Sequence, residues 1–267
     1  MKVAIVANDR VETQAVVKNL EKMLAAKKIE IDPENPDVVI TVGGDGTLLS
    51  AFHKYVNIVD KVRFLGVHTG HLGFYTDWRN FEIGKLVDNL TKKQPSTASY
   101  PLLELMITTG DGEKTKFLAL NEATIKRVSK TLTADVYIRD QFFESFKGDG
   151  LCVSTPTGST AYSKSLGGAV IHPRLKALQM TEIASINNRV FRTLSSPIVI
   201  APDEWITLKP EAGGHYVVTY DGYKFNHKHI QKIEYRISQH VIRFDKYQHT
   251  HFWNRVEDAF IGHDKEV

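Results

Sequence analysis

Two spacings of apolar residues alternate over the first part of the chain. Short apolar runs rich in β-branched residues are typical of buried strands. They alternate with segments in which apolar residues recur every three to four positions, as on one face of a helix. Asp9 and Glu12 stand three apart at the start of the first helical segment and predict a capping box there. The predicted strands cover 1–7, 38–42 and 62–67, and the predicted helices cover 10–28, 47–55 and 81–90.

This alternation of strands and helices predicts a parallel sheet with crossover helices, an α/β domain. Ligands of such sheets bind at the carboxyl ends of the strands. Gly43–Gly46 follows the second predicted strand, and His68–Gly73 follows the third. We expect these two glycine-containing segments to form two walls of one crevice.

The spacing changes near residue 100, where period-two patterns and hairpin turns predict a mainly antiparallel, β-rich C-terminal domain. We therefore expect an α/β domain over 1–100 and a β-rich domain over 101–267. The stripe at 252–260 has helical spacing, so residues 252–267 are expected to return and pack on the first domain. The later predicted strands are 102–108, 114–120, 134–138, 142–146, 197–200, 205–208, 216–220, 230–237 and 241–244.

Composition is that of a folded protein with a weak basic bias. The chain has 267 residues, of which 42% are hydrophobic and 24% charged, with a net charge of +3. The charges are interspersed, which argues against nucleic acid and membrane partners and suits a small anionic substrate. No apolar run has the length of a spanning helix. The one cysteine, Cys152, lies in an apolar run, so we expect a buried structural thiol, a reducing compartment and a cytoplasmic location.

The segment from Gly43 to Gly46 carries the clearest chemistry. A strand, a glycine loop and a helix in succession aim backbone N–H groups at a phosphate. Asp45 puts a carboxylate into that loop. Because a carboxylate repels phosphate, Asp45 is expected to bind a hydroxyl, take a proton or meet a metal. The alternative is a tight turn in which Asp45 caps the helix.

His68 and His71 raise the possibility of a metal site, but the neighbouring glycines favour a loop and no third ligand follows. We interpret both histidines as turn or substrate-contact residues. The aromatic residues Phe74, Tyr75 and Trp78 are expected to belong to the core rather than to a platform for stacking bases.

A second polar segment covers 147–168 and is dense in glycine and hydroxyl residues. We interpret it as a long functional loop that is too polar to enter the core. Asn121 and Glu122 stand at the end of a predicted strand. Asp221 and Gly222 are interpreted as a simple hairpin turn.

Several motifs resemble one enzyme family. The glycine loop reads GGDGT at 43–47, which is similar to a kinase superfamily that includes NAD, diacylglycerol and sphingosine kinases. The later motifs resemble the NAD kinase family in content and order, and the resemblance covers nearly the whole chain. They read HTGHLGF at 68–74, NE at 121–122, GDGLCVSTPTGSTAYSKSLGG at 148–168 and ASINNR at 184–189. The compact length resembles the bacterial members.

The resemblance implies transfer of a phosphoryl group to the 2′-hydroxyl of the adenosine ribose of NAD, giving NADP. The implied donor is ATP or inorganic polyphosphate, with Mg²⁺ or another divalent cation. Asp45 would act as the base, while Gly43, Gly44 and Gly46 would contact the donor phosphates. The family forms homodimers and homotetramers, which implies a homo-oligomer here. No metal-binding side chain is implied.

The resemblance also implies a set of NAD contacts. Tyr162 is expected to stack on a base. Lys147 stands where many relatives have arginine and lacks the bidentate fork of that side chain. The implied NAD-binding residues are Asp45, Gly46, His71, Phe74, Asn121, Glu122, Lys147, Asp149, Thr157, Thr160, Ala161, Tyr162, Ser163, Lys164, Ser165, Ala184 and Asn188.

Two alternatives stay open at the level of the sequence. A lipid kinase of the same superfamily would need an apolar membrane-binding segment, and none is apparent. A non-catalytic NAD-binding module would not need Asp45, which is present within an intact GGDGT. A Rossmann dehydrogenase is disfavoured because no G-x-G-x-x-G follows the first strand.

Overall fold

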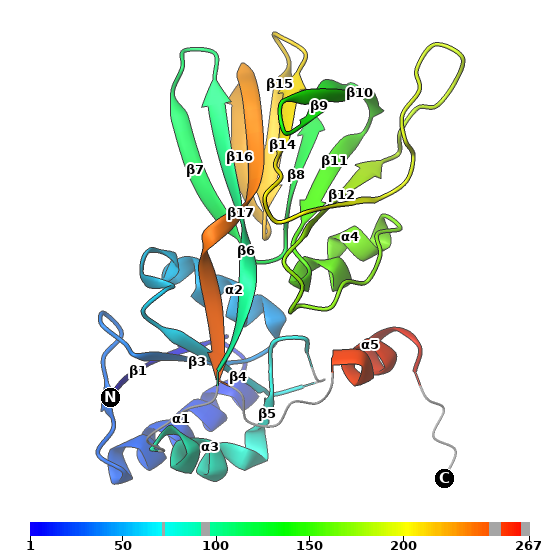
Figure 1. The fold of residues 1–267 in the computed structure, drawn as a ribbon. Coiled ribbons are helices and arrows are strands. Elements are labelled where there is room, and N and C mark those ends of the chain that lie inside the picture. Colours follow the sequence, from blue (N-terminus) through cyan, green and yellow to red (C-terminus); the bar gives the residue numbers. More distant parts are fainter. Residues whose placement is uncertain (71–72, 92–96, 246–251, 263–267) are drawn as a thin grey trace. The chain divides into compact units, whose positions relative to one another are not determined.

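A computed structural model describes residues 1–70, 73–91, 97–245 and 252–262 (Figure 1). The chain divides into two compact units. Unit 1 contains residues 1–99 and 242–267, and unit 2 contains residues 100–241.

Unit 1 is built on a parallel sheet. Its strands lie in the order β17-β4-β3-β1-β2, with β5 beside β4, and every pairing in it is parallel among the described residues. Only the last residues of β17 belong here, where Phe244 pairs with Phe64. The predicted parallel α/β architecture is confirmed. The strands are β1 (Lys2–Ala7), β2 (Glu30–Ile31), β3 (Val38–Val42), β4 (Arg63–His68), β5 (Trp78–Arg79) and β17 (Ile230–Asp245).

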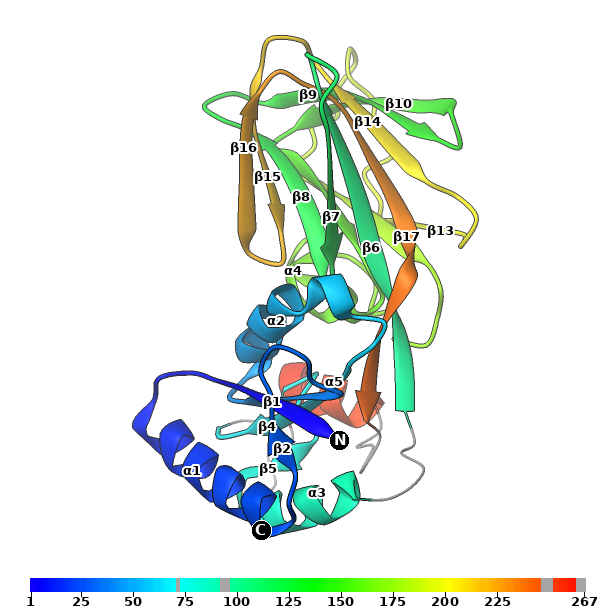
Figure 2. The same ribbon diagram turned by 90° about the vertical axis from the view of Figure 1, so that its left-hand side faces the viewer.

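Helices cover both faces of this sheet. Helices α1 and α3 lie side by side on one face, and α2 lies on the other (Figures 1 and 2). Alternate residues of β3, such as Ile40, pack with Leu20 of α1 and Leu86 of α3, because successive side chains of a strand point to opposite faces. The helices are α1 (Val11–Ala26), α2 (Asp45–Lys54), α3 (Ile83–Leu90) and α5 (Phe252–Phe260), with short 3₁₀ turns at Val56–Ile58 and Asn80–Glu82.

The predicted capping box at the start of α1 is wrong. The helix begins at Val11, and its N-cap is Arg10, which makes no side-chain capping hydrogen bond. Asp9 therefore lies one residue too early to cap the helix. The Arg10 N–H instead donates to Oδ1 of Asn8 at 3.2 Å.

The C-terminal helix α5 returns to unit 1, as predicted. Arg255 of α5 forms an ion pair with Asp77. The ring of Phe260 stacks on the ring of Phe74, with centroids 5.9 Å apart. Both a charged and an apolar contact therefore hold this helix in unit 1.

Unit 2 contains two antiparallel sheets that enclose one core. One sheet contains β10-β9-β14-β17 in that order, with β6 beside β17 and β7 beside β6. The other has the order β13-β12-β11-β8-β15-β16. Both sheets contribute to the shared core, for example Val136 from the first and Leu151 from the second. The strands are β6 (Thr97–Thr109), β7 (Lys114–Ala119), β8 (Glu122–Arg127), β9 (Leu132–Ile138), β10 (Gln141–Gly148), β11 (Gly150–Ser154), β12 (Leu178–Ile183), β13 (Ile198–Ile200), β14 (Ile206–Pro210), β15 (His215–Tyr220) and β16 (Tyr223–Lys228).

The interpretation of 147–168 as one long loop outside the core is wrong. Strand β11 lies between β8 and β12, and a 3₁₀ turn (Thr157–Thr160) and the short helix α4 (Tyr162–Ser165) follow it. Ser154, Thr155 and Ser159 are fully buried. Backbone carbonyls accept hydrogen bonds from such hydroxyls, and the Thr155 hydroxyl donates to the Leu120 carbonyl at 2.6 Å. Cys152 is buried, as predicted, and burial raises the pKa of its thiol.

Candidate functional site

Asp45 is the first residue of α2 and follows β3 after two glycines, with Gly44 as the N-cap. The helix begins two residues earlier than the apolar spacing predicts, so Asp45 lies within the first turn. A negative charge there interacts favourably with the helix dipole. The carboxylate thus lies at the carboxyl end of β3, where a parallel sheet binds its ligands.

The segment after β4 contacts this carboxylate. The backbone N–H of Phe74 donates to Asp45 Oδ2 at 2.9 Å, and the N–H of Tyr75 donates to Oδ1 at 3.0 Å. A Cβ atom on Gly73 would lie 2.2 Å from Asp45 Oδ1, so only glycine allows this approach. The two glycine-containing segments therefore meet, as their positions after adjacent strands predict.

Arg255 of α5 lies behind the same segment. Its Nη1 donates to the carbonyl oxygens of Gly73, at 3.1 Å, and Phe74, at 2.7 Å, and its guanidinium pairs with Asp77. The residue is only 7% exposed. Burial lowers the pKa of Arg255, and the charge of Asp45 partly offsets that effect. Sequence reasoning missed this residue. The available signal was an arginine within the apolar stripe of 252–260.

The loop glycines differ in what their backbones do. The Gly43 N–H donates to the Val67 carbonyl at 2.9 Å, so it connects β3 to β4. A Cβ atom on Gly44 or Gly46 would meet no atom within 4 Å. The Gly43 N–H is therefore already bonded within the sheet, whereas open space lies beside Gly44 and Gly46.

Among the described residues, no group of three or more His, Cys, Asp or Glu side chains gathers that could hold a metal ion. His68 Nδ1 lies 2.9 Å from the carbonyl of Gly70, which is a turn contact. His71, an expected NAD contact, lies outside the described residues. Tyr75 and Trp78 are buried, as predicted. The Phe74 ring is half-buried against the ring of Phe260.

In unit 2, Asn121 and Glu122 are held by a residue far away in the chain. The Asp221 carboxylate accepts backbone N–H groups from Leu120 at 2.6 Å, Asn121 at 2.7 Å and Glu122 at 3.3 Å. Asp221 and Gly222 do form the predicted hairpin turn between β15 and β16. The turn also serves to fix the Asn121–Glu122 backbone, which the simple-turn interpretation missed.

Glu122 is a half-buried acid. Its Oε2 atom is buried and has no hydrogen-bond partner among the described residues. Burial raises the pKa of Glu122 to about 8, and the charge of Asp221 adds to the effect. The side chain is therefore mostly protonated at neutral pH and can both donate and accept a hydrogen bond.

The segment after β11 packs against Asn121. The Thr157 hydroxyl donates to the Leu120 carbonyl at 2.9 Å. A Cβ atom on Gly158 would lie 2.0 Å from the Asn121 carbonyl oxygen, so the two backbones touch. The structure therefore brings Asn121 and Glu122 together with the segment that contains Thr157, Thr160, Ala161, Tyr162, Ser163, Lys164 and Ser165.

Side chains of this segment differ in exposure. Tyr162 is 36% exposed, and its hydroxyl accepts a hydrogen bond from Lys126 Nζ at 3.2 Å. Ser163 is fully buried, and its hydroxyl accepts a hydrogen bond from Gln179 Nε2 at 3.0 Å. Tyr162 therefore faces the surface, whereas the Ser163 side chain belongs to the interior.

A second group of expected contacts gathers around the other end of β11. The Asp149 N–H donates to the Ile183 carbonyl at 2.9 Å, beside Ala184. Lys147 Nζ lies 4.1 Å from the centre of the Phe191 ring. Asn188 Oδ1 accepts the Phe191 N–H at 2.9 Å. The 5 residues of β11 separate this group from Asn121. At roughly 3.3 Å per residue, the strand spans about 16 Å.

Two glutamates that sequence reasoning missed hold the segment carrying Asn188. Glu144 Oε2 accepts the Leu194 N–H at 2.8 Å, and Glu182 Oε1 accepts the Ser195 N–H at 3.0 Å. Burial raises the pKa of Glu144, and the neighbouring Glu182 contributes to this shift. Their partners lie many residues away, so no local pattern marked them.

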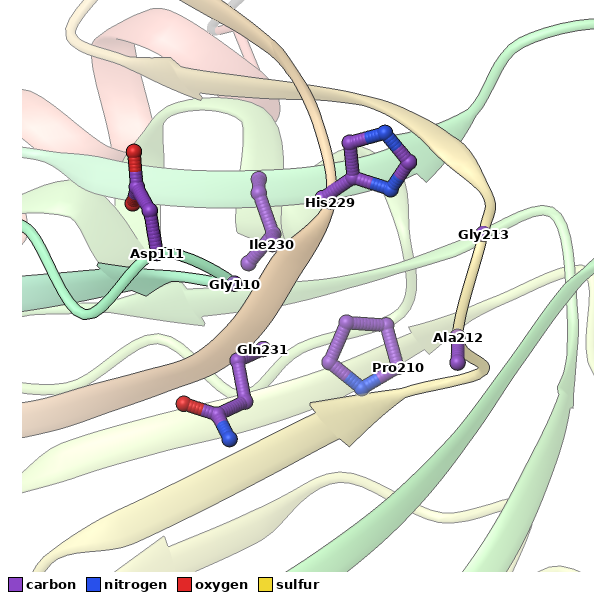
Figure 3. Close-up of a pocket in the computed structure, with 8 residues that line it drawn as sticks. All are labelled: Gly110, Asp111, Pro210, Ala212, Gly213, His229, Ile230 and Gln231. Atoms are coloured by element: carbon purple, nitrogen blue, oxygen red, sulfur yellow. The ribbon is translucent and has the colours of Figure 1, made fainter.

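A pocket of about 500 Å³ lies elsewhere in unit 2 and contains none of the expected site residues (Figure 3). Three turns form it, between β6 and β7, β14 and β15, and β16 and β17. The Gly110 N–H joins two of these turns by donating to the His229 carbonyl at 2.7 Å. The lining residues are Gly110, Asp111, Pro210, Ala212, Gly213, His229, Ile230 and Gln231.

Comparison with known proteins shows which family this chain resembles. Residues 3–94 match the family model described as the ATP-NAD kinase N-terminal domain, and residues 120–245 match that of the ATP-NAD kinase C-terminal domain. A protein of Lactobacillus gasseri named NAD kinase is 88% identical over 265 residues, 99% of each chain. One of Lactobacillus johnsonii with the same name is 87% identical over 268 residues, covering 100% of this chain and 99% of the relative.

Two solved structures share the fold at low sequence identity. Yeast NADH kinase complexed with NADH has a TM-score of 0.85 and 20% identity, covering 100% of this chain and 89% of the other. An NAD kinase from Archaeoglobus fulgidus in complex with ATP has a TM-score of 0.78 and 24% identity, covering 97% and 98%. With both family models matched along its length and relatives of this identity, the chain belongs to the ATP-NAD kinase family.

Proposed function

We propose that this chain is an NAD kinase, a phosphotransferase that makes NADP from NAD with ATP or inorganic polyphosphate as donor. The observation that carries the proposal is the Asp45 carboxylate, which two backbone N–H groups hold at the start of α2. The Lactobacillus gasseri relative is named NAD kinase, which supports NAD as the proposed substrate.

In the proposed reaction the ribose 2′-oxygen of NAD attacks the terminal phosphorus of the donor. A new P–O bond forms as the bond to the leaving phosphate breaks, and the hydroxyl proton passes to Asp45. Each carboxylate oxygen of Asp45 accepts one backbone N–H and keeps lone-pair capacity for the 2′-hydroxyl. Phosphoryl transfer depends mainly on positioning and charge neutralisation, which suits a site with one held carboxylate.

The donor phosphates are proposed to lie against Gly44 and Gly46. No side chain fills the space where their Cβ atoms would stand, and the first N–H groups of a helix favour anions. A divalent cation such as Mg²⁺ fits this site because it binds through substrate phosphates, waters and one or two carboxylates, of which Asp45 is one. When bound, it would neutralise charge on the phosphates.

NAD is proposed to contact both groups of residues in unit 2, with His71 and Phe74 as further contacts. Asn121 and Glu122 offer an amide and a protonated acid, which match the donors and acceptors of base edges and ribose hydroxyls. Tyr162, partly exposed beside Lys126, is proposed to stack on a base. The remaining proposed contacts are Lys147, Asp149, Thr157, Thr160, Ala161, Lys164, Ser165, Ala184 and Asn188.

The protein is proposed to act as a homodimer or homotetramer. The proposed NAD contacts near Asn121 and those near Asp149 lie at opposite ends of β11. In an oligomer, one NAD molecule could therefore contact the first set in one copy of the chain and the second set in another copy. Light scattering after size exclusion would give the number of subunits. The cytoplasm is the proposed compartment, where a lone thiol such as Cys152 stays reduced.

A coupled assay tests the proposal. Purified protein is incubated with NAD and Mg²⁺ and with either ATP or polyphosphate, and NADP is read with a dehydrogenase specific for it. We expect NADP from at least one donor and its loss in Asp45→Asn. NAD binding without NADP from either donor would instead indicate a non-catalytic binding module and would contradict the proposal.

A further inference from the structure

Two peptide groups connect Arg255 to Asp45. The Gly73 carbonyl and the Phe74 N–H belong to one peptide unit, and the Phe74 carbonyl and the Tyr75 N–H belong to the next. Arg255 Nη1 donates to both carbonyl oxygens, at 3.1 Å and 2.7 Å. Asp45 accepts both N–H groups, at 2.9 Å and 3.0 Å. The cation and the carboxylate therefore hold the same two peptide units from opposite ends.

This arrangement strengthens both sets of hydrogen bonds. A cation at a carbonyl oxygen polarises the peptide unit and makes its N–H a better donor, and the effect is larger where water is excluded. Arg255 is 7% exposed, so its charge acts in such a place. Charge-assisted hydrogen bonds are also shorter and stronger than those between two neutral groups.

The other arm of the guanidinium fixes its direction. Its Nη2 pairs with Asp77, while Nη1 reaches the two carbonyl groups. The planar fork of arginine serves both partners at once, which a lysine ammonium does less well. Burying this cation carries a desolvation cost, which an apolar side chain would avoid if α5 needed only an attachment point.

We propose that Arg255 is a positioning residue for phosphoryl transfer, which holds the 73–75 backbone so that two N–H groups aim the Asp45 carboxylate at the acceptor hydroxyl. The inference rests on the proposed function for its kinetic consequences. The hydrogen-bond geometry itself can be tested without substrate.

The kinetic test uses the whole protein and a set of matched variants. We expect Arg255→Met to lower kcat about 10- to 100-fold, the range for loss of hydrogen bonds to a charged group, with KM for NAD and ATP within about twofold. Arg255→Lys should recover part of kcat. Asp77→Asn leaves both contacts of Arg255 with carbonyl groups in place, so its kcat should fall less than that of Arg255→Met. Asn254→Ala, exposed on the same helix, should match the original protein.

Chemical rescue separates positioning from simple attachment of the helix. In Arg255→Ala, millimolar guanidinium should restore part of kcat by occupying the vacated space, and an equal concentration of sodium chloride should not. A kcat for Arg255→Met within twofold of the original, or a loss in Asp77→Asn as large as in Arg255→Met, would overturn the proposal.

A measurement without substrate tests the role of Arg255 independently of whether the protein makes NADP. In ¹⁵N-labelled protein, the amide protons of Phe74 and Tyr75 should resonate downfield because they donate to a carboxylate. In Arg255→Met they should move upfield and exchange faster, while in Asn254→Ala they should stay in place. Unchanged shifts in Arg255→Met would overturn the inference even if the protein makes NADP, and changed shifts would support it even if the protein makes none.

Discussion

The Asp221 carboxylate accepts the backbone N–H of Asn121 at 2.7 Å, although 100 residues separate the two in the chain. It also accepts the N–H of Leu120, and the Asp221 N–H donates to the Glu122 carbonyl at 3.1 Å. A hairpin turn thus determines how the Asn121–Glu122 pair is presented. This pair belongs to the proposed NAD site, so we expect a change at the turn to alter NAD binding.

Asp221→Asn should weaken NAD binding. An amide NH₂ cannot accept a hydrogen bond, so one backbone N–H of the Leu120–Glu122 segment loses its partner, at a cost of about 1–3 kcal/mol. We expect KM for NAD to rise about tenfold and kcat to fall less. Steady-state kinetics check this, with Lys224→Ala, an exposed residue of β16, as the control. Equal losses in both variants would contradict it.

Gly73→Ala should impair catalysis. The added methyl group would lie 2.2 Å from Asp45 Oδ1, so the carboxylate or the 73–75 backbone must move. Misplacing a catalytic group by about 1 Å costs roughly 100-fold in rate. Gly70→Ala is the matched control, because a Cβ atom there meets nothing within 4 Å. A kcat within threefold of the original in Gly73→Ala would show that the close approach is unimportant.

Glu122 should make the folded state less stable as the pH rises. Its pKa is about 8 in the fold, against an ordinary value of 4.5, so the folded state binds more protons between these values. The free energy of unfolding contributed by Glu122 is fully present below about pH 4.5 and is lost as the pH rises towards 8. Residue 122 cannot ionise in Glu122→Gln. The free energy of unfolding of this variant, minus that of the original protein, should therefore be larger at pH 8 than at pH 5, by on the order of a few kcal/mol.

Urea unfolding of both proteins at pH 5 and pH 8, without ligands, tests this prediction. The difference in unfolding free energy between Glu122→Gln and the original protein should grow with pH. A difference that stays constant between the two pH values would mean that Glu122 ionises normally in the fold.

Glu182→Ala should loosen the segment that carries Asn188. Glu182 accepts the Thr193 hydroxyl at 2.8 Å and the Ser195 N–H at 3.0 Å. Without it we expect amide hydrogen exchange of Ser195 to accelerate about tenfold or more, since a charge-assisted hydrogen bond is lost. Exchange within β8, for example at Ile125, should not change. Unaltered protection at Ser195 would contradict the prediction.

Local patterns predicted much of the fold. The strand before the glycine loop, the helix after it and the C-terminal helical stripe were found from spacing alone, because each pattern is complete within a few residues. The exact start of α1 was missed, since a capping box depends on which single residue takes the N-cap conformation. Strand β11 was missed, although Leu151, Cys152 and Val153 form an apolar run, because the glycine and hydroxyl residues around this run are typical of a loop. The burial of those hydroxyl residues depends on carbonyl partners from elsewhere in the chain.

The sequence by itself determined the kind of chemistry here, through Asp45 within GGDGT and the motif at 148–168. Only the tertiary structure decided what orients these groups. Arg255 meets the Gly73 carbonyl across 182 residues, and Asp221 meets Asn121 across 100. Such contacts form because buried polar groups must find partners, and the nearest partner in space is set by how the strands and helices pack rather than by neighbours in the chain.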